Sequence, residues 1–184
     1  MRVYEGSPRQ DFEEAMRSIG AVLDERGMRE ILLTEAPDGF IVQGLVVAGA
    51  ASGGRSESLG QMVKETLTFV DADISRFIEE AASRRGSGAR TREQMLGVAS
   101  YEQALRVLGH YIDRQKPRDV FFFEQDGSFV IRLLMDTRTG ARHVIAEFTR
   151  EEVEGMIGQG PAWRAAALRR GGPMPASPRP LVDR

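Results

Sequence analysis

The feature that most constrains the fold of this chain is an internal repeat. Residues 12–36 align without a gap with residues 101–125, and seven of the 25 aligned positions are identical. Residues 38–47 then match residues 126–135 after the deletion of one residue, and residues 66–78 match residues 145–157. Two similar stretches of this length predict one folding unit present twice.

Each copy has the sequence pattern of an α-β-β-β-α unit. Apolar residues recur at helical spacing in the opening segment of each copy, and strand-like runs follow. The expected strands cover residues 29–36, 40–48 and 62–69 in the first copy, and 118–124, 128–136 and 142–148 in the second. The sequence Thr149-Arg-Glu-Glu152 is a capping-box signal for the closing helix. We therefore expect an α+β fold in which helices pack on one face of antiparallel sheet(s) and a pseudo-twofold axis relates the halves.

Four parts of the chain follow from this repeat. They are a first repeat (1–84), a linker rich in Gly, Ser and Arg (85–99), a second repeat (100–160), and a short helix with a Pro-rich tail (161–184). Within the first repeat, residues 49–60 form a Gly- and Ser-rich segment of the kind that makes flexible loops. By element order alone, the arrangement resembles the saddle of TATA-binding proteins and, more loosely, secretion-chaperone-like folds. Such a likeness implies no function.

The turns set which side chains face the helices. Asp126-Gly127 predicts a two-residue type I′ hairpin. Because the first copy has Pro37 as an extra residue, we expect a three-residue loop with Gly39 left-handed in a bulge. In that register the core face carries Ile31, Leu33, Ile41, Gln43 and Leu45 in the first copy, and Val120, Phe122, Phe129, Ile131 and Leu133 in the second.

The opposite face of the sheet is apolar where water would be expected. The residues assigned to this surface are Leu32, Phe121, Phe123, Val130, Arg132 and Leu134. Soluble monomers seldom leave an apolar patch uncovered, so something should lie over it. A second subunit is the first choice, the C-terminal segment with Trp163 is the second, and a ligand or nucleic acid is the third.

Composition excludes several classes of chemistry. The 184 residues are 41% hydrophobic and 28% charged, with a formal net charge of −2 and no cysteine. A thiolate site is excluded, and no apolar run reaches the roughly 18 residues of a membrane span, so we expect a soluble cytoplasmic protein. Neither His110 nor His143 has metal-site spacing, and Asp71 and Asp73 suit a helix start, so we expect no metal or cofactor.

Three functional hypotheses remain open. We favour a non-enzymatic binding or scaffold protein that forms a homodimer, or binds another protein, through the apolar face. A nucleic-acid-binding protein could stack bases on Phe121 and Phe123 and hold phosphates with Arg132 and the linker arginines, although the negative net charge disfavours it. An enzyme or small-ligand sensor would have a site between the repeats, near Glu35, Glu124 and His143, although the sequence has no catalytic motif.

Overall fold

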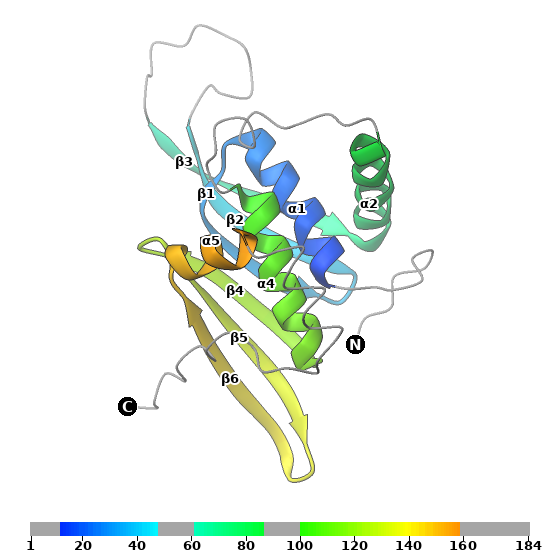
Figure 1. Ribbon diagram of the computed structural model, residues 1–184, viewed down its shortest axis with the longest axis vertical. Coiled ribbons are helices and arrows are strands. Elements are labelled where there is room, and N and C mark those ends of the chain that lie inside the picture. Colours follow the sequence, from blue (N-terminus) through cyan, green and yellow to red (C-terminus); the bar gives the residue numbers. More distant parts are fainter. Residues whose placement is uncertain (1–11, 48–60, 87–99, 159–184) are drawn as a thin grey trace, which may run out of the picture.

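A computed structural model describes residues 12–47, 61–86 and 100–158 (Figure 1). These residues form an α+β fold with one six-stranded antiparallel sheet and four helices. The elements are α1 (Phe12–Arg26), β1 (Arg29–Ala36), β2 (Gly39–Val47), β3 (Met62–Val70), α2 (Asp71–Gly86), α4 (Tyr101–Gln115), β4 (Asp119–Gln125), β5 (Ser128–Thr137), β6 (Gly140–Phe148) and α5 (Arg150–Gly158). The predicted order of helices and strands is confirmed over the described residues.

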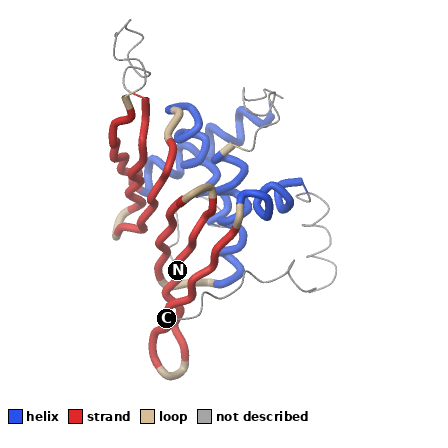
Figure 2. Tube along the Cα trace, turned by 90° about the vertical axis from the view of Figure 1, so that its left-hand side faces the viewer, coloured by secondary structure: helices blue, strands red, loops and turns tan. Residues whose placement is uncertain are grey.

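The two sets of three strands join at the centre of a single sheet. The strand order is β3-β2-β1-β4-β5-β6, and all neighbours are antiparallel. At the junction of β1 and β4, Leu33 pairs with Phe122, Leu32 with Phe123, and Thr34 with Phe121. Figure 2 shows the helices together on one side of this sheet. The other side, which we call the outer face, is the one that points away from α1 and α4.

The core lies between the sheet and the helices α1 and α4, which cross the central strands side by side (Figure 1). Phe40, Phe122, Met16, Leu105 and Leu108 are among its largest fully buried side chains. Burial of one such side chain contributes about 2 kcal/mol to the free energy of unfolding. The core runs continuously across the β1–β4 junction.

The predicted core face is confirmed for β1, β4 and β5 but is wrong for β2. In β2 the buried side chains are Phe40 and Val42, both with no exposed area. Ile41, Gln43 and Leu45 are half-buried and lie on the outer face. A shift of one residue in pairing moves every side chain of a strand to the other face.

The error comes from the turn that joins β1 to β2. Ala36 pairs with Gly39, so the loop is the two residues Pro37 and Asp38, and Gly39 belongs to the strand. Its glycine is required by close approach, because a Cβ on Gly39 would lie 1.8 Å from the carbonyl oxygen of Phe69. The irregularity is in β1 instead, where the register shifts between Arg29 and Leu32 and Glu30 has a φ of 50°.

The β4–β5 turn follows the prediction. Asp126 and Gly127 have φ values of 50° and 78°, as a type I′ turn requires. With β2 in its true register, residues 12–47 align with residues 101–136 without a gap, and Phe40 aligns with Phe129.

Two aligned pairs of residues differ in size in a way that compensates. Gly44 aligns with Leu133, and Met28 aligns with Pro117. A Cβ on Gly44 would lie 2.5 Å from Cγ of Met28, whose side chain is fully buried. The Met28 side chain therefore fills the space that a larger residue at position 44 would need. In the second half, the side chain of Leu133 fills the corresponding space itself.

Candidate binding surface and cleft

Two rows of side chains cross the outer face at the middle of the sheet. The strand register places Thr68, Ile41, Thr34, Phe121, Arg132 and Ile145 in the first row, and Thr66, Gln43, Leu32, Phe123, Val130 and Glu147 in the second. All six residues predicted for the apolar surface lie on this face, with Leu134 beyond the rows on β5. We refer to Leu32, Phe121, Phe123 and Val130 as the apolar cluster.

The apolar cluster spans the β1–β4 junction. Its four side chains are all half-buried. The rings of Phe121 and Phe123 contact each other, with centroids 5.9 Å apart and planes tilted by 60°. Neighbours along a row are cross-strand pairs, which support one another's packing. The result is a cohesive apolar surface rather than scattered exposed residues.

Polar groups border the cluster on β5 and β6. The Nε of Arg132 donates a hydrogen bond to Nδ1 of His143 at 3.2 Å. Glu147 pairs with Val130 across the strands, so it lies on the other side of Ile145 from His143. The border therefore carries a basic group, Arg132 on β5, and an acidic group, Glu147 on β6.

The predicted site at Glu35, Glu124 and His143 is not assembled. Glu35 and Glu124 both point toward the helices, but they lie on opposite sides of the central Leu33–Phe122 pair. At about 3.3 Å per residue, the four-residue offset separates them by roughly 13 Å along the strands. His143 is on the outer face beside Arg132. Glu124 instead belongs to a cleft beside the β4–β5 hairpin.

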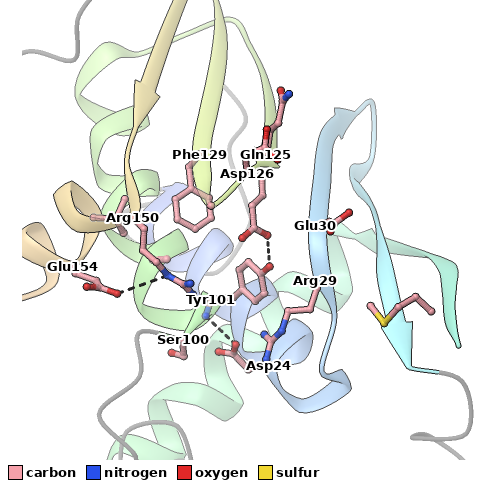
Figure 3. Close-up of a pocket in the computed structure, with 15 residues that line it drawn as sticks. Asp24, Arg29, Glu30, Ser100, Tyr101, Gln125, Asp126, Phe129, Arg150 and Glu154 are labelled. Atoms are coloured by element: carbon pink, nitrogen blue, oxygen red, sulfur yellow. Dashed lines mark hydrogen bonds and ion pairs between the residues drawn. The ribbon is translucent and has the colours of Figure 1, made fainter. Parts of the chain in front are cut away.

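This cleft has a volume of about 630 Å³ and lies where the β4–β5 hairpin meets the starts of β1, α4 and α5. In Figure 3, Tyr101 lies at its middle, with Phe129 on one side and Arg29 on the other. The pocket walls therefore come from segments that are far apart in the sequence. Among its lining residues, the sequence had indicated only Glu124 as a candidate for a functional site.

A buried tyrosine and a carboxylate meet in the cleft. The hydroxyl of Tyr101 donates a hydrogen bond to Oε2 of Glu124. Burial, and then the neighbouring Glu124 carboxylate, raise the pKa of Tyr101 far above its usual value of 10.0. Tyr101 therefore stays protonated at every physiological pH and keeps donating to Glu124.

Helix α1 fixes the position of Tyr101. Asp24 of α1 accepts hydrogen bonds from the backbone N–H groups of Tyr101 and Glu102, each at 2.9 Å. These are donors that the helix itself leaves unpaired. Ser100 adds a conventional N-cap by accepting from Gln103 N–H at 3.3 Å.

The opposite end of the helix pair has the same arrangement with the partners exchanged. Asp113 of α4 accepts from the backbone N–H groups of Phe12 and Glu13, at 2.8 and 3.0 Å. Sequence reasoning missed both caps. The signal that could have indicated them is that Asp24 and Asp113 are identical residues at aligned positions of the repeat.

Two aligned glycines bring the helices together. A Cβ on Gly20 would lie 2.5 Å from the carbonyl oxygen of Tyr101, and a Cβ on Gly109 would lie 2.5 Å from that of Phe12. The crossing of α1 and α4 has no room for a side chain at either position. The two glycines thus set the distance at which the caps can form.

The remaining polar candidates have local partners. Nδ1 of His110 lies 2.9 Å from Oε2 of Glu13 on α1. Asp71 and Asp73 lie in the first turn of α2, the position expected for them. The predicted capping box is confirmed, because Thr149 N–H donates to Glu152 and Glu152 N–H donates to the Thr149 hydroxyl, at 2.8 and 3.2 Å. Residues 12–47, 61–86 and 100–158 contain no group of three or more His, Asp or Glu side chains placed to hold a metal ion.

Several predicted segments lie outside the described residues. They are the loop at 49–60, residues 87–99 of the predicted linker, and the tail at 161–184 with Trp163. The first two linker residues, 85 and 86, belong to α2. Among the helices that the structure describes, none combines the length and the apolar character needed to cross a membrane.

Comparison with known proteins gives no relative for this chain. No protein-family model, no curated protein and no solved structure matches it. The outer face and the cleft are therefore the features from which a function can be inferred.

Proposed function

We propose that this chain is a non-enzymatic binding protein that forms a homodimer through the outer face of its sheet. The observation that carries the proposal is the apolar cluster, which occupies the middle of that face across the β1–β4 junction. An apolar patch at the centre of a sheet, bordered by polar groups, has the composition of a protein interface.

The proposal includes a duplicated unit with a pseudo-twofold axis through the Leu33–Phe122 pair. Three kinds of contact around this pair support it, because they recur with their partners exchanged. Leu32 pairs with Phe123 as Thr34 pairs with Phe121. The two cross-helix caps and the two glycine contacts follow the same exchange.

A second copy is the occupant that best fits this symmetry. A homodimer interface is self-complementary, so the same surface must serve both subunits. Under the pseudo-twofold, one row of the outer face maps onto the other in reverse order, with Ile41 on Val130 and Leu32 on Phe121. Six strands about 4.8 Å apart and roughly 30 Å long offer roughly 800 Å² per subunit, the area of a standard interface.

Charge placement favours one way of packing the two sheets. A dimer axis that runs across the strands, between the two rows, sets Phe121 of one copy over Phe123 of the partner subunit. The same axis brings Arg132 beside Glu147 of the partner subunit, so the basic and acidic borders meet. This packing is an aligned sandwich of two sheets, whose separation is about 10 Å.

The test is the mass of the full chain in solution by light scattering at micromolar concentration. We expect twice the chain mass for the wild type and the single chain mass for Phe121→Asp, because a carboxylate would be buried without a partner. Val63→Asp is the matched control, since Val63 is 39% exposed and lies on β3 toward the helix side. It should remain dimeric.

A monomeric wild type would overturn the proposal. If that monomer also bound single-stranded oligonucleotides with an affinity that falls steeply with salt, the nucleic-acid hypothesis would replace it.

A further inference from the structure

We propose that the cleft around Tyr101 and Glu124 binds a small organic cation that carries a primary ammonium or guanidinium group. This site is on the helix side of the sheet, at the end of the β4–β5 hairpin, and is separate from the outer face. The inference therefore does not depend on dimerisation.

The size and walls of the cleft suit such a ligand. Its volume of about 630 Å³ is within the range of about 300–1,000 Å³ that is typical of small-molecule sites. The rings of Tyr101 and Phe129, each 6% exposed, form part of its wall. Aromatic faces attract cations, and they do so more strongly when the site is desolvated.

Charge in the cleft favours a cation over an anion. Five carboxylates line it against two arginines, an excess of three negative charges. Two of the carboxylates already have structural roles: Asp24 caps α4, and Glu154 lies 3.7 Å from the Nε of Arg150. An anionic ligand would meet this acidic excess, and Arg150 is already opposite an acid.

Glu124 has the chemistry to receive the cation. Its Oε2 accepts from Tyr101, and in the part of the chain that the structure describes its other oxygen has no hydrogen-bond partner. The Tyr101 hydroxyl donates to Glu124, which leaves its oxygen able to accept as well. An ammonium or guanidinium donor can therefore bridge the free carboxylate oxygen and the tyrosine oxygen.

The aligned position at the other end of the helix pair lacks this chemistry. Phe12 takes the place of Tyr101, and its ring packs edge-on against Phe40 with centroids 6.2 Å apart. Phe12 has no hydroxyl that could donate to Glu35, the residue aligned with Glu124. The proposed site is therefore specific to one half of the chain, and the other half supplies matched controls.

The experiment is calorimetric titration of the full chain with agmatine and putrescine, with succinate as the anionic control. Both amines should bind and succinate should not. Glu124→Gln should weaken amine binding at least tenfold, because it removes the charge that faces the ligand. Tyr101→Phe, which installs the residue found at position 12, should weaken it severalfold while the fold is retained.

Glu35→Gln is the control that separates this site from a general effect of charge. It removes the same charge from the aligned position and should leave the affinity for agmatine unchanged. The inference is overturned if neither amine binds at millimolar concentration, if succinate binds as tightly as the amines, or if Glu35→Gln and Glu124→Gln weaken binding equally. Circular dichroism of each variant checks that a loss of binding is not a loss of fold.

Discussion

The crossing of α1 and α4, which we call the seam, and the two surfaces that border water differ in how closely their aligned residues agree. At the seam, α1 and α4 cap and cross each other through the same residue types, Asp24 with Asp113 and Gly20 with Gly109. On the surfaces that border water, aligned positions carry different side chains. Tyr101 in the cleft aligns with Phe12, and Phe123 on the outer face aligns with Thr34.

The difference follows from the space available. Backbone touches backbone at the seam, so no other side chain fits there. The cleft and the outer face border water, so substitutions there change chemistry without disturbing the packing. Both surfaces for which we propose binding contain a position at which the second half carries an aromatic ring or a hydroxyl group that the aligned residue of the first half lacks.

The most severe test of the seam is a methyl group on either glycine. Gly20→Ala and Gly109→Ala should each lower the free energy of unfolding by about 3 kcal/mol, because the new Cβ meets backbone that cannot rotate away. Urea denaturation measures both. Similar losses are expected. A loss below about 0.5 kcal/mol at one position would show that the two glycine contacts are not equivalent.

The exchange of volume between Met28 and Gly44 can be tested by a double-mutant cycle. Gly44→Ala alone should destabilise the fold, since its Cβ would lie 2.5 Å from Cγ of Met28. In the Met28→Ala background the same change should cost less, with a coupling free energy of about 2 kcal/mol. Additive losses in urea denaturation would mean that Met28 does not fill the space above Gly44.

Removal of each cross-helix cap tests whether the two ends of the seam have equal strength. Asp24→Ala and Asp113→Ala should each lower the free energy of unfolding by about 1–2 kcal/mol, because each carboxylate accepts two backbone N–H groups. Asparagine at either position should restore part of the loss, since its side-chain oxygen can still accept. Equal stability of the Ala and wild-type chains would rule out a capping role.

The smallest expected effect is a loss of stability at alkaline pH. It comes from Tyr101, and Phe12 at the aligned position cannot contribute to it. Because the pKa of Tyr101 is raised in the folded chain, its stabilisation is present below the unfolded pKa near 10.0 and decreases above it. From pH 10 to 11 the loss should be about 1 kcal/mol.

Tyr101→Phe should remove this part of the pH dependence. Burial also raises the pKa of Tyr111, so a second, weaker contribution should remain in the variant. Thermal unfolding of both chains as a function of pH measures the difference. An unchanged slope in Tyr101→Phe would show that Tyr101 ionises equally well in both states.

The sequence predicted the elements well because apolar spacing and turn residues are local signals. Phe12, Met16, Ile19 and Leu23 marked α1, and Asp126-Gly127 marked the hairpin of the second half. The register of β2 could not be obtained in this way. The irregularity lies at Glu30, a residue type with no preference for a positive φ, and Pro37 suggested the wrong place for it.

The outer face and the cleft could be predicted from the sequence to different degrees. All six residues of the predicted apolar surface lie on the outer face, because alternation along β1, β4 and β5 is itself a sequence pattern. The cleft could not be predicted, because it forms only where β1, α4, α5 and a hairpin meet. The sequence does not show that β1 pairs with β4. Glu35 and Glu124 looked like a pair in the alignment, yet the antiparallel junction places them at opposite ends.

The most direct test of the central claim is the dimer dissociation constant, measured by sedimentation equilibrium for the wild type and for Phe123→Thr. This variant gives the second half the residue that the first half has at position 34. We predict a wild-type dimer at micromolar concentration and at least tenfold weaker association for the variant, with unchanged thermal stability of the monomer. A wild-type chain that stays monomeric throughout, or a variant that dimerises as tightly, would contradict the account.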